Sequence, residues 1–326
     1  MSWEQDLAKA YRSPNDLVKL GLISKEQADA VSLVAKQYQF LLSDYYASLI
    51  DPNDPDCPIR LQAIPALDEV EVVEREVSDP LQDLKHQPVE RVTHRYRNRV
   101  LLHLTPNCSM YCRFCFRKTL LNGLKEDLFS GGLEAAFRYL AETVEISEVI
   151  FSGGDPFMVT DDQLRRVIAE LSGMSHVKRI RFHTRVPVTL PSRVTSGLIE
   201  VLGSSRFHPV VVTHFNHPKE ITSQAQEAIR SLKQVSLLLN QSVLLKRVND
   251  SVSTLTELSE RLFDSGVLPY YLHQLDPSRG THHFFVEPKE GKRLWERMKE
   301  GLPGYLVPRY VVDQVGIPFK KEVEGF

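Results

Sequence analysis

The sequence has few cysteines, only two tryptophans and almost no net charge. Its 326 residues include four cysteines and balance 40 basic side chains against 42 acidic ones. This balance gives no support for polyelectrolyte binding to nucleic acid. A membrane span is also not predicted, because the most apolar early stretch, residues 40–50, is short and contains Asp44. The first residues are polar and acidic, without the pattern of a signal peptide, so we expect a cytoplasmic protein.

Three of the four cysteines lie within eight residues, with the spacing CxxxCxxC: Cys108, Cys112 and Cys115. A disulfide framework would need paired cysteines spread along the chain, whereas clustered thiolates are ligands for zinc or for iron–sulfur clusters. Three cysteines can bind three irons of a [4Fe–4S] cube and leave the fourth iron open. The alternative is a structural zinc site, which needs a fourth ligand from Cys57, His94 or His103. We expect Cys57, isolated in a segment rich in proline and aspartate, to be a bystander.

From Tyr96 onward, short apolar runs alternate with helix-like polar stretches. This alternation predicts βαβ units with buried parallel strands. Polar residues follow most of the predicted strands and should therefore meet on one face of the sheet. One of these segments is Ser152-Gly153-Gly154-Asp155, whose glycines would let the backbone approach a ligand closely. The six predicted strands are Val100–Leu104, Glu148–Phe151, Arg179–Phe182, Pro209–Thr213, Val235–Leu239 and Leu268–Leu272.

Residues 1–93 are predicted to form a helical extension and a connecting segment. Ser13 before Pro14 is typical of a helix start, and Ser24 with Gln27 fits a capping box. Apolar residues then recur at helical spacing from Ala28 to Tyr45. The acidic segment from residue 68 to residue 79 is expected to be solvated surface or a linker.

Several ordered blocks of this sequence resemble the radical S-adenosylmethionine (SAM) enzymes of the lysine 2,3-aminomutase family. The resemblance runs from about residue 40 nearly to the C-terminus. It implies an α/β fold, a partial (βα)6 TIM-like barrel of the radical SAM type over residues 94–326. The blocks include Thr93–Tyr96, Cys108–Arg113, Ser152–Asp155, Thr213–Pro218, Asn240–Leu245 and Val248–Asp250.

The resemblance implies an isomerase that converts L-lysine to β-lysine with a [4Fe–4S] cluster, SAM and pyridoxal 5′-phosphate (PLP). Cys108, Cys112 and Cys115 would hold the cluster. SAM would bind at Ser152, Gly153, Gly154 and Asp155, with His214 and Gln241 as further cofactor-binding residues. Arg95, Tyr96 and Arg99 would grip the PLP phosphate, a role suited to paired guanidinium groups. The substrate carboxylate would pair with Arg117, and its distal ammonium with Asp276 and Asp313.

Lys320 lies seven residues after Asp313, at the family's interval for the lysine that binds PLP covalently, and Lys321 is the alternative. The larger family members have a C-terminal extension with clustered cysteines for zinc. This sequence ends at Phe326 and resembles the short branch that supplies β-lysine for elongation factor P, although Asp313 favours the free-lysine enzymes.

The resemblance also implies a reductant such as flavodoxin or ferredoxin, and leaves a homo-oligomer open. Two alternative functions remain at this point. One is a radical SAM enzyme that acts on a different amino acid. The other is a protein without PLP that holds only a cluster or a zinc ion.

Overall fold

A single sheet of nine strands, in the order β1 to β9, organises the computed structural model, which describes residues 2–123 and 131–324. Strands β2 to β8 are all parallel to their neighbours, whereas β1 and β9 pair antiparallel at the two ends. The strands are β1 (Val92–Tyr96), β2 (Arg99–Thr105), β3 (Glu148–Gly153), β4 (Arg179–His183), β5 (Val210–Thr213), β6 (Leu237–Val243), β7 (Leu268–His273), β8 (Arg309–Val312) and β9 (Lys321–Glu322).

The six predicted strands correspond to β2 to β7, and the α/β fold with a mostly parallel sheet is confirmed. Strand β3 shows why the apolar pattern predicted the strands correctly: its apolar residues Val149, Ile150 and Phe151 are all buried. A central parallel strand is covered on both faces and therefore reads as a continuous apolar run. The structure adds β8 as a seventh parallel strand, so six βα units are followed by one further strand.

Helices cover the outer face of the sheet, and their capping residues mark where they begin. In α8, Thr160 and Gln163 form a capping box, and Leu164, Val167, Ile168 and Leu171 form the buried face. The helices are α1 (Trp3–Ala8), α2 (Pro14–Lys19), α3 (Lys25–Gln37), α4 (Asp44–Ala47), α5 (Pro58–Ala63), α6 (Lys118–Gly123), α7 (Glu134–Glu142), α8 (Asp161–Ser172), α9 (Val186–Thr189), α10 (Ser196–Gly203), α11 (Ser223–Lys233), α12 (Val252–Asp264) and α13 (Pro288–Gly301).

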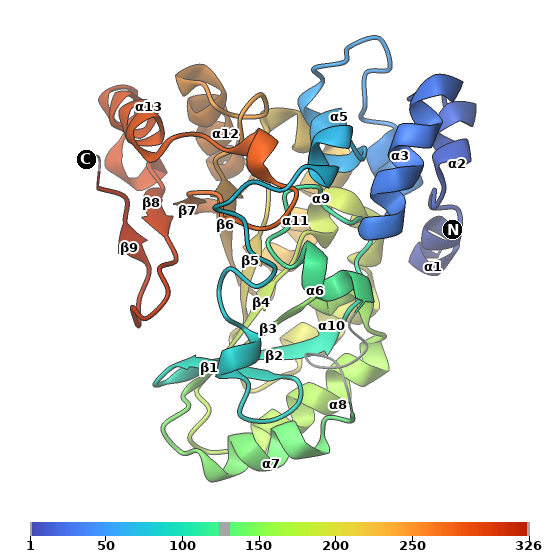
Figure 1. Cartoon of the computed structure of the whole chain (residues 1–326). Coiled ribbons are helices and arrows are strands. Elements are labelled where there is room, and N and C mark those ends of the chain that lie inside the picture. Colours follow the sequence, from blue (N-terminus) through green and yellow to red (C-terminus); the bar gives the residue numbers. More distant parts are fainter. Residues whose placement is uncertain (1, 124–130, 325–326) are drawn as a thin grey trace.

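The N-terminal helices α1 to α3 lie together on one side of the molecule, far from the β8–β9 hairpin (Figure 1). The predicted starts are confirmed, since Ser13 caps α2 and Ser24 caps α3 through Gln27. The predicted length of the second helix is wrong, because α3 ends at Gln37. The following residues are extended instead, and Leu42 forms a β-bridge with Tyr11.

The acidic segment from residue 68 to residue 79 is not simply solvated surface, and this prediction is wrong for two of its carboxylates. Glu69 is fully buried, and it accepts hydrogen bonds from Arg113 Nε at 3.0 Å and from Lys118 Nζ at 2.6 Å. Glu76 is also buried and accepts from the backbone nitrogens of Thr281 and His282. These contacts attach the segment to the cysteine loop and to the chain after β7.

No helix within the described residues is both long enough and apolar enough to cross a membrane.

Glu69→Gln should lower the free energy of unfolding by about 3–5 kcal/mol, because it leaves two buried cations without their counter-charge. Burial alone would raise the pKa of Glu69, but Arg113 and Lys118 outweigh burial and lower it to about 2. The carboxylate is therefore charged at pH 7, where urea unfolding would measure the effect. The control is Glu257→Gln, which removes an exposed i,i+4 pair with Arg261 and should change stability by less than about 0.5 kcal/mol. Equal effects of the two substitutions would contradict this prediction.

Candidate active site

One cavity of about 710 Å³ lies inside the barrel and is lined by residues from both ends of the parallel strands. Its volume is in the range of small-molecule and cofactor sites. Every residue predicted from the sequence to belong to the site lines it: Arg95, Tyr96, Arg99, Cys108, Cys112, Cys115, Arg117, Ser152, Gly153, Gly154, Asp155, His214, Gln241, Asp276, Asp313 and Lys320. The topology explains the convergence of the residues that follow parallel strands, because these strands end on the same face, whereas Arg95, Tyr96 and Arg99 come from β1 and the start of β2.

The three clustered cysteines lie in the loop between β2 and α6, and the N-terminal segment holds this loop in place. Tyr111 N donates to Leu41 O, and Arg113 N donates to Gln62 O. Burial raises the pKa of Cys108 and Cys115, that of Cys115 to about 11, and the neighbouring thiolates act in the same direction. These two thiols stay protonated at pH 7 unless a positive charge stabilises their thiolates, and iron ions would supply that charge.

Within the part of the chain that the structure describes, no three His, Cys, Asp or Glu side chains are placed closely enough to hold a metal ion. The loop thus fits a cluster by its donor set, not by a preformed coordination geometry. The structure does not support the alternative of a structural zinc site, because each residue proposed as the fourth ligand makes other contacts. Cys57 is buried in the hydrophobic core, His94 Nδ1 lies 2.6 Å from Tyr139 Oη, and His103 Nε2 lies 2.8 Å from Thr93 Oγ1.

The glycine pair after β3 packs against the backbone that precedes the cysteine loop. Gly153 has a φ of +116°, and a Cβ on Gly154 would lie 2.4 Å from Asn107 O. Gly154 N donates to Thr105 O at 2.7 Å, and Asp155 N donates to Asn107 O at 2.8 Å. In the described contacts, these glycines therefore allow the backbone of the glycine loop to approach the backbone at the start of the cysteine loop. It fixes the glycine loop relative to the cysteines.

Asp155 is buried and anchors the chain that follows β4. Its carboxylate accepts from Thr184 Oγ1 at 2.7 Å, from Arg185 N at 2.7 Å and from Phe157 N at 3.0 Å. Arg185 follows the predicted strand Arg179–Phe182 and was not predicted as a site residue. The structure buries its guanidinium against Cys112 Sγ, at 2.8 Å, and Glu220 Oε1, at 2.7 Å.

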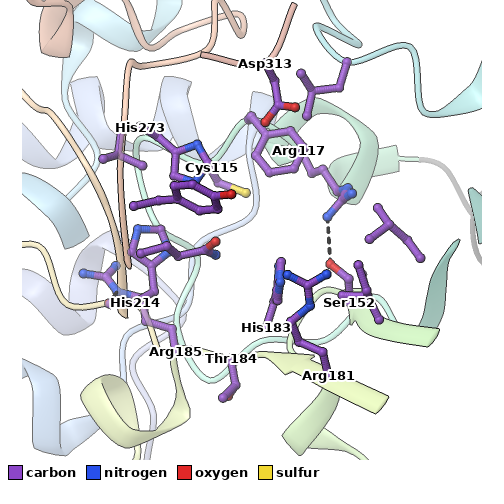
Figure 2. A pocket seen from close by; sticks show the side chains of 18 of the residues that line it. Cys115, Arg117, Ser152, Arg181, His183, Thr184, Arg185, His214, His273 and Asp313 are labelled. Carbon is purple, nitrogen blue, oxygen red and sulfur yellow. Dashed lines mark hydrogen bonds between the residues drawn. The ribbon is translucent and has the colours of Figure 1, made fainter. Parts of the chain in front are cut away.

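Arg117 has a buried carboxylate partner that the sequence did not reveal. Its Nε donates to Asp83 Oδ2 at 2.7 Å, and its Nη1 donates to Ser152 Oγ at 3.0 Å (Figure 2). Asp83 lies 34 residues earlier in the chain, and no motif marked it. The pair holds the guanidinium at the cavity wall, beside the glycine loop.

Asp313, which follows β8, contacts residues from both ends of the sheet. It pairs with Lys320 Nζ, accepts from Tyr96 Oη at 3.2 Å and lies 3.5 Å from Arg95 Nη1. Lys321, in contrast, pairs with Glu324 at 3.4 Å and is not among the residues that line the cavity.

Arg95 and Arg99, both expected at the PLP phosphate, line the cavity but lie in different contacts. Arg95 Nη2 donates to Gln314 O at 2.7 Å, whereas the Arg99 guanidinium lies 4.1 Å from the centre of the Tyr96 ring. The two side chains thus lie near Tyr96, but their guanidinium groups are not arranged as a pair around one common site.

Asp276 is the second carboxylate at this end of the cavity. Among the described residues no ion pair of Asp276 is found, in contrast to Asp313. Burial raises the pKa of Asp276 to about 7, and the negative charge of Asp313 acts in the same direction. A cation bound beside Asp276 would therefore favour the charged form of this carboxylate and lower its pKa.

Three histidines that contribute to the cavity wall are held neutral by burial, which lowers the pKa of His183 and His214 well below the usual value and that of His273 to about 3. Within the described part of the chain, Nε2 of His183 and Nε2 of His214 are buried without a hydrogen-bond partner. Buried polar atoms are normally paired, so these two nitrogens indicate that a polar ligand completes the site. Of the three, only His214 was predicted from the sequence.

A family described as "4Fe-4S single cluster domain" matches residues 97–186, which contain all three clustered cysteines. L-lysine 2,3-aminomutase of Clostridium subterminale is 38% identical over 316 residues, which are 96% of this chain and 76% of that protein. L-lysine 2,3-aminomutase of Escherichia coli (strain K12) is 34% identical over 324 residues, 99% of this chain and 94% of that protein. The solved structure of a radical SAM methyltransferase from Sphaerobacter thermophilus aligns with a TM-score of 0.46 and 18% identity, over 68% of each chain.

Asp276→Asn should make the protein more stable than the natural chain at pH 8 and have little effect at pH 4. The folded pKa of about 7 lies above the ordinary value of 3.8, so the stability that Asp276 contributes is present below pH 4 and is lost as the pH rises through 7. Urea unfolding at the two pH values measures the difference. The control is Asp264→Asn, at the exposed end of α12, which should show no such pH dependence. An equal effect of D276N at both pH values would contradict the prediction.

Proposed function

Because this chain belongs to the L-lysine 2,3-aminomutase family, we propose that it converts L-lysine to β-lysine by moving an amino group between adjacent carbons. The observation that carries the proposal is the single cavity, which brings the three clustered cysteines together with Lys320, Arg117 and two carboxylates. When bound, the [4Fe–4S] cluster, SAM and PLP of this family supply the radical chemistry and the reactive aldehyde. The chain supplies binding, orientation and a site shielded from water.

Cys108, Cys112 and Cys115 are proposed to hold the cluster, with SAM beside it. The donor set supports this, because soft thiolates suit iron and three of them leave one iron open to another ligand. Ser152, Gly153, Gly154 and Asp155 are held next to the cysteine loop by backbone hydrogen bonds. They are proposed to bind SAM together with His214 and Gln241, and the unpaired His214 Nε2 supports a polar partner there.

PLP is proposed to lie toward β1, β2 and the chain after β8. Arg95, Tyr96 and Arg99 would hold its phosphate, since guanidinium groups bind phosphate through charge-assisted hydrogen bonds. Lys320 would bind its aldehyde, and the Nζ of Lys320 is held inside the cavity by Asp313. In this arrangement Asp313 orients the amine and limits its rotation before any ligand enters.

The substrate is proposed to be lysine because the cavity offers an anion site and a cation site. Arg117 would pair with the carboxylate, and its fixed position between Asp83 and Ser152 supports this role. Asp276 and Asp313 would receive the distal ammonium. Two carboxylates in a shielded site repel an acidic side chain, so glutamate would be rejected.

The electron for the cluster is proposed to come from a separate protein such as flavodoxin or ferredoxin. The support is the cysteine count: beyond the three in the loop, the sequence has only Cys57, which is too few for a second cluster of the Cys₄ type. The product would serve free lysine metabolism or the modification of elongation factor P. Both uses require the same β-lysine.

Reconstituted protein incubated anaerobically with reductant, SAM, PLP and L-lysine should accumulate β-lysine, measured by mass spectrometry, while most SAM remains intact. Cys112→Ala is the matched variant, and it should lose iron and reduce β-lysine to background together. Turnover by C112A would contradict the proposed mechanism. If 5′-deoxyadenosine forms without β-lysine, the radical chemistry is present but lysine is the wrong substrate.

Lys320→Ala should abolish the covalent bond to PLP, whereas Lys321→Ala should keep it. The reason is that Lys320 lines the cavity and Lys321 points away toward Glu324. Borohydride trapping with PLP, followed by peptide mapping, identifies the modified lysine without any need for turnover. A label that persists in K320A and disappears in K321A would reverse the assignment.

A further inference from the structure

Arg185 is a buried cation in direct contact with one of the three clustered cysteines. It follows β4, and its Nη1 donates to Cys112 Sγ at 2.8 Å. Among the described residues, no side chain donates a hydrogen bond to the sulfur of Cys108 or Cys115. The contact therefore singles out Cys112, and Arg185 lines the cavity near His214 (Figure 2).

The guanidinium of Arg185 is fixed on all three nitrogens. Nε donates to His214 O at 3.2 Å, and Nη2 donates to Gln62 Oε1 at 2.6 Å and to Glu220 Oε1 at 2.7 Å. Its backbone nitrogen is held by Asp155. A long side chain that is tied at this many points cannot move away from Cys112 without breaking several buried hydrogen bonds, each of which would leave an unpaired polar group.

Glu220 is the counter-charge of this arginine and is itself fully buried. Its Oε1 also accepts from Tyr46 Oη at 2.7 Å, and its Oε2 accepts from the backbone nitrogens of Asn216 and His217 at 2.6 and 3.0 Å. The carboxylate is thus held in place by donors on both of its oxygens. It accepts from Nη2, whereas the sulfur accepts from Nη1, so it weakens the positive field at Cys112 without replacing the hydrogen bond.

The chemistry of the contact follows from charge. Reduction of a [4Fe–4S] cluster adds one electron, supplied from outside, and makes the cluster and its thiolates more negative. A hydrogen bond and a positive charge at a ligand sulfur stabilise the reduced form more than the oxidised form and so raise the reduction potential.

We propose that Arg185 is a positioning residue that holds Cys112 Sγ and raises the reduction potential of the cluster, with Glu220 limiting the size of this effect. The inference rests on the proposed function only in that the three cysteines hold a cluster. It does not depend on lysine or PLP. A purely structural role would make loss of either charge disruptive in the same way, whereas an electrostatic role gives the two charges opposite effects on the potential.

The test is a redox titration of the reconstituted cluster, followed by electron paramagnetic resonance, without SAM, PLP or lysine. At a fixed potential, Arg185→Met should lower the ratio of reduced to oxidised cluster about tenfold, which is about 59 mV for a one-electron couple. Glu220→Gln should raise this ratio, by up to about tenfold. Arg185→Lys keeps the charge and should stay within about threefold of the natural protein.

Two further variants keep the test decisive. Arg185→Met alone leaves Glu220 buried without a partner, so the double variant R185M/E220Q removes both charges and should fold if R185M does not. Its ratio of reduced to oxidised cluster should fall by less than in R185M, because the loss of the negative charge opposes the loss of the positive charge. The matched control is Arg181→Met: Arg181 lies on the same strand and lines the same cavity, but it pairs with Glu148 at 3.0 Å and should leave the potential unchanged.

Opposite shifts in R185M and E220Q would support the proposal. Shifts of the potential in the same direction, or no shift in either variant, would overturn it. Loss of iron from R185K as well as from the other variants would also overturn it, because that result indicates a packing role alone. A natural protein that takes up no iron would instead contradict the proposed function.

Discussion

The buried carboxylate of Glu69 is the contact on which the arrangement of the site depends. It lies between Arg113 and Lys118, and the side chains of all three are almost fully removed from solvent. A buried charge is tolerated only when it is paired and hydrogen-bonded, so the segment before the barrel cannot detach from the cysteine loop without a large loss of free energy. Lys118 Nζ also donates to Gly280 O, which brings the chain after β7 to the same point. Once the cysteine loop is fixed here, Asn107 O in turn holds the glycine loop through Asp155 N.

The cavity is built from opposite charges placed in pairs, and one carboxylate is left over. Asp83 compensates Arg117, Glu220 compensates Arg185, and Lys320 with Arg95 compensates Asp313. Asp276 has no such partner within the described residues, and the field of Asp313 together with burial raises its pKa. A site with one uncompensated, shielded carboxylate favours a ligand that brings a positive charge. Preference for a cationic group at this end of the cavity then follows from Asp276, whose carboxylate the neighbouring pairs leave uncompensated.

The sequence predicted the repeating fold from local patterns, whereas most residues of the cavity were predicted from the resemblance to a known family. Apolar runs marked β2 to β7, and the parallel order of those strands brought the post-strand residues to one face. The contacts that it failed to predict join residues far apart in the chain. Glu69 meets Arg113 across 44 positions, and Asp83 meets Arg117 across 34. The early end of α3 has the same origin, because the apolar spacing continues past Gln37 while the bridge between Tyr11 and Leu42 requires extended chain. No local pattern encodes such pairings.

The N-terminal segment therefore belongs to the site as well as to the cover of the barrel. Gln62 accepts from both Arg113 N, through its backbone oxygen, and Arg185 Nη2, through its side chain. One residue of α5 thus touches the cysteine loop and the arginine that binds Cys112 Sγ. Glu69 holds the same loop from its other side. Because these donors and acceptors are buried, small displacements of the segment would change the position of the cysteine sulfurs directly. The positions of the cysteine sulfurs are consequently determined in part by residues that precede the first strand of the sheet.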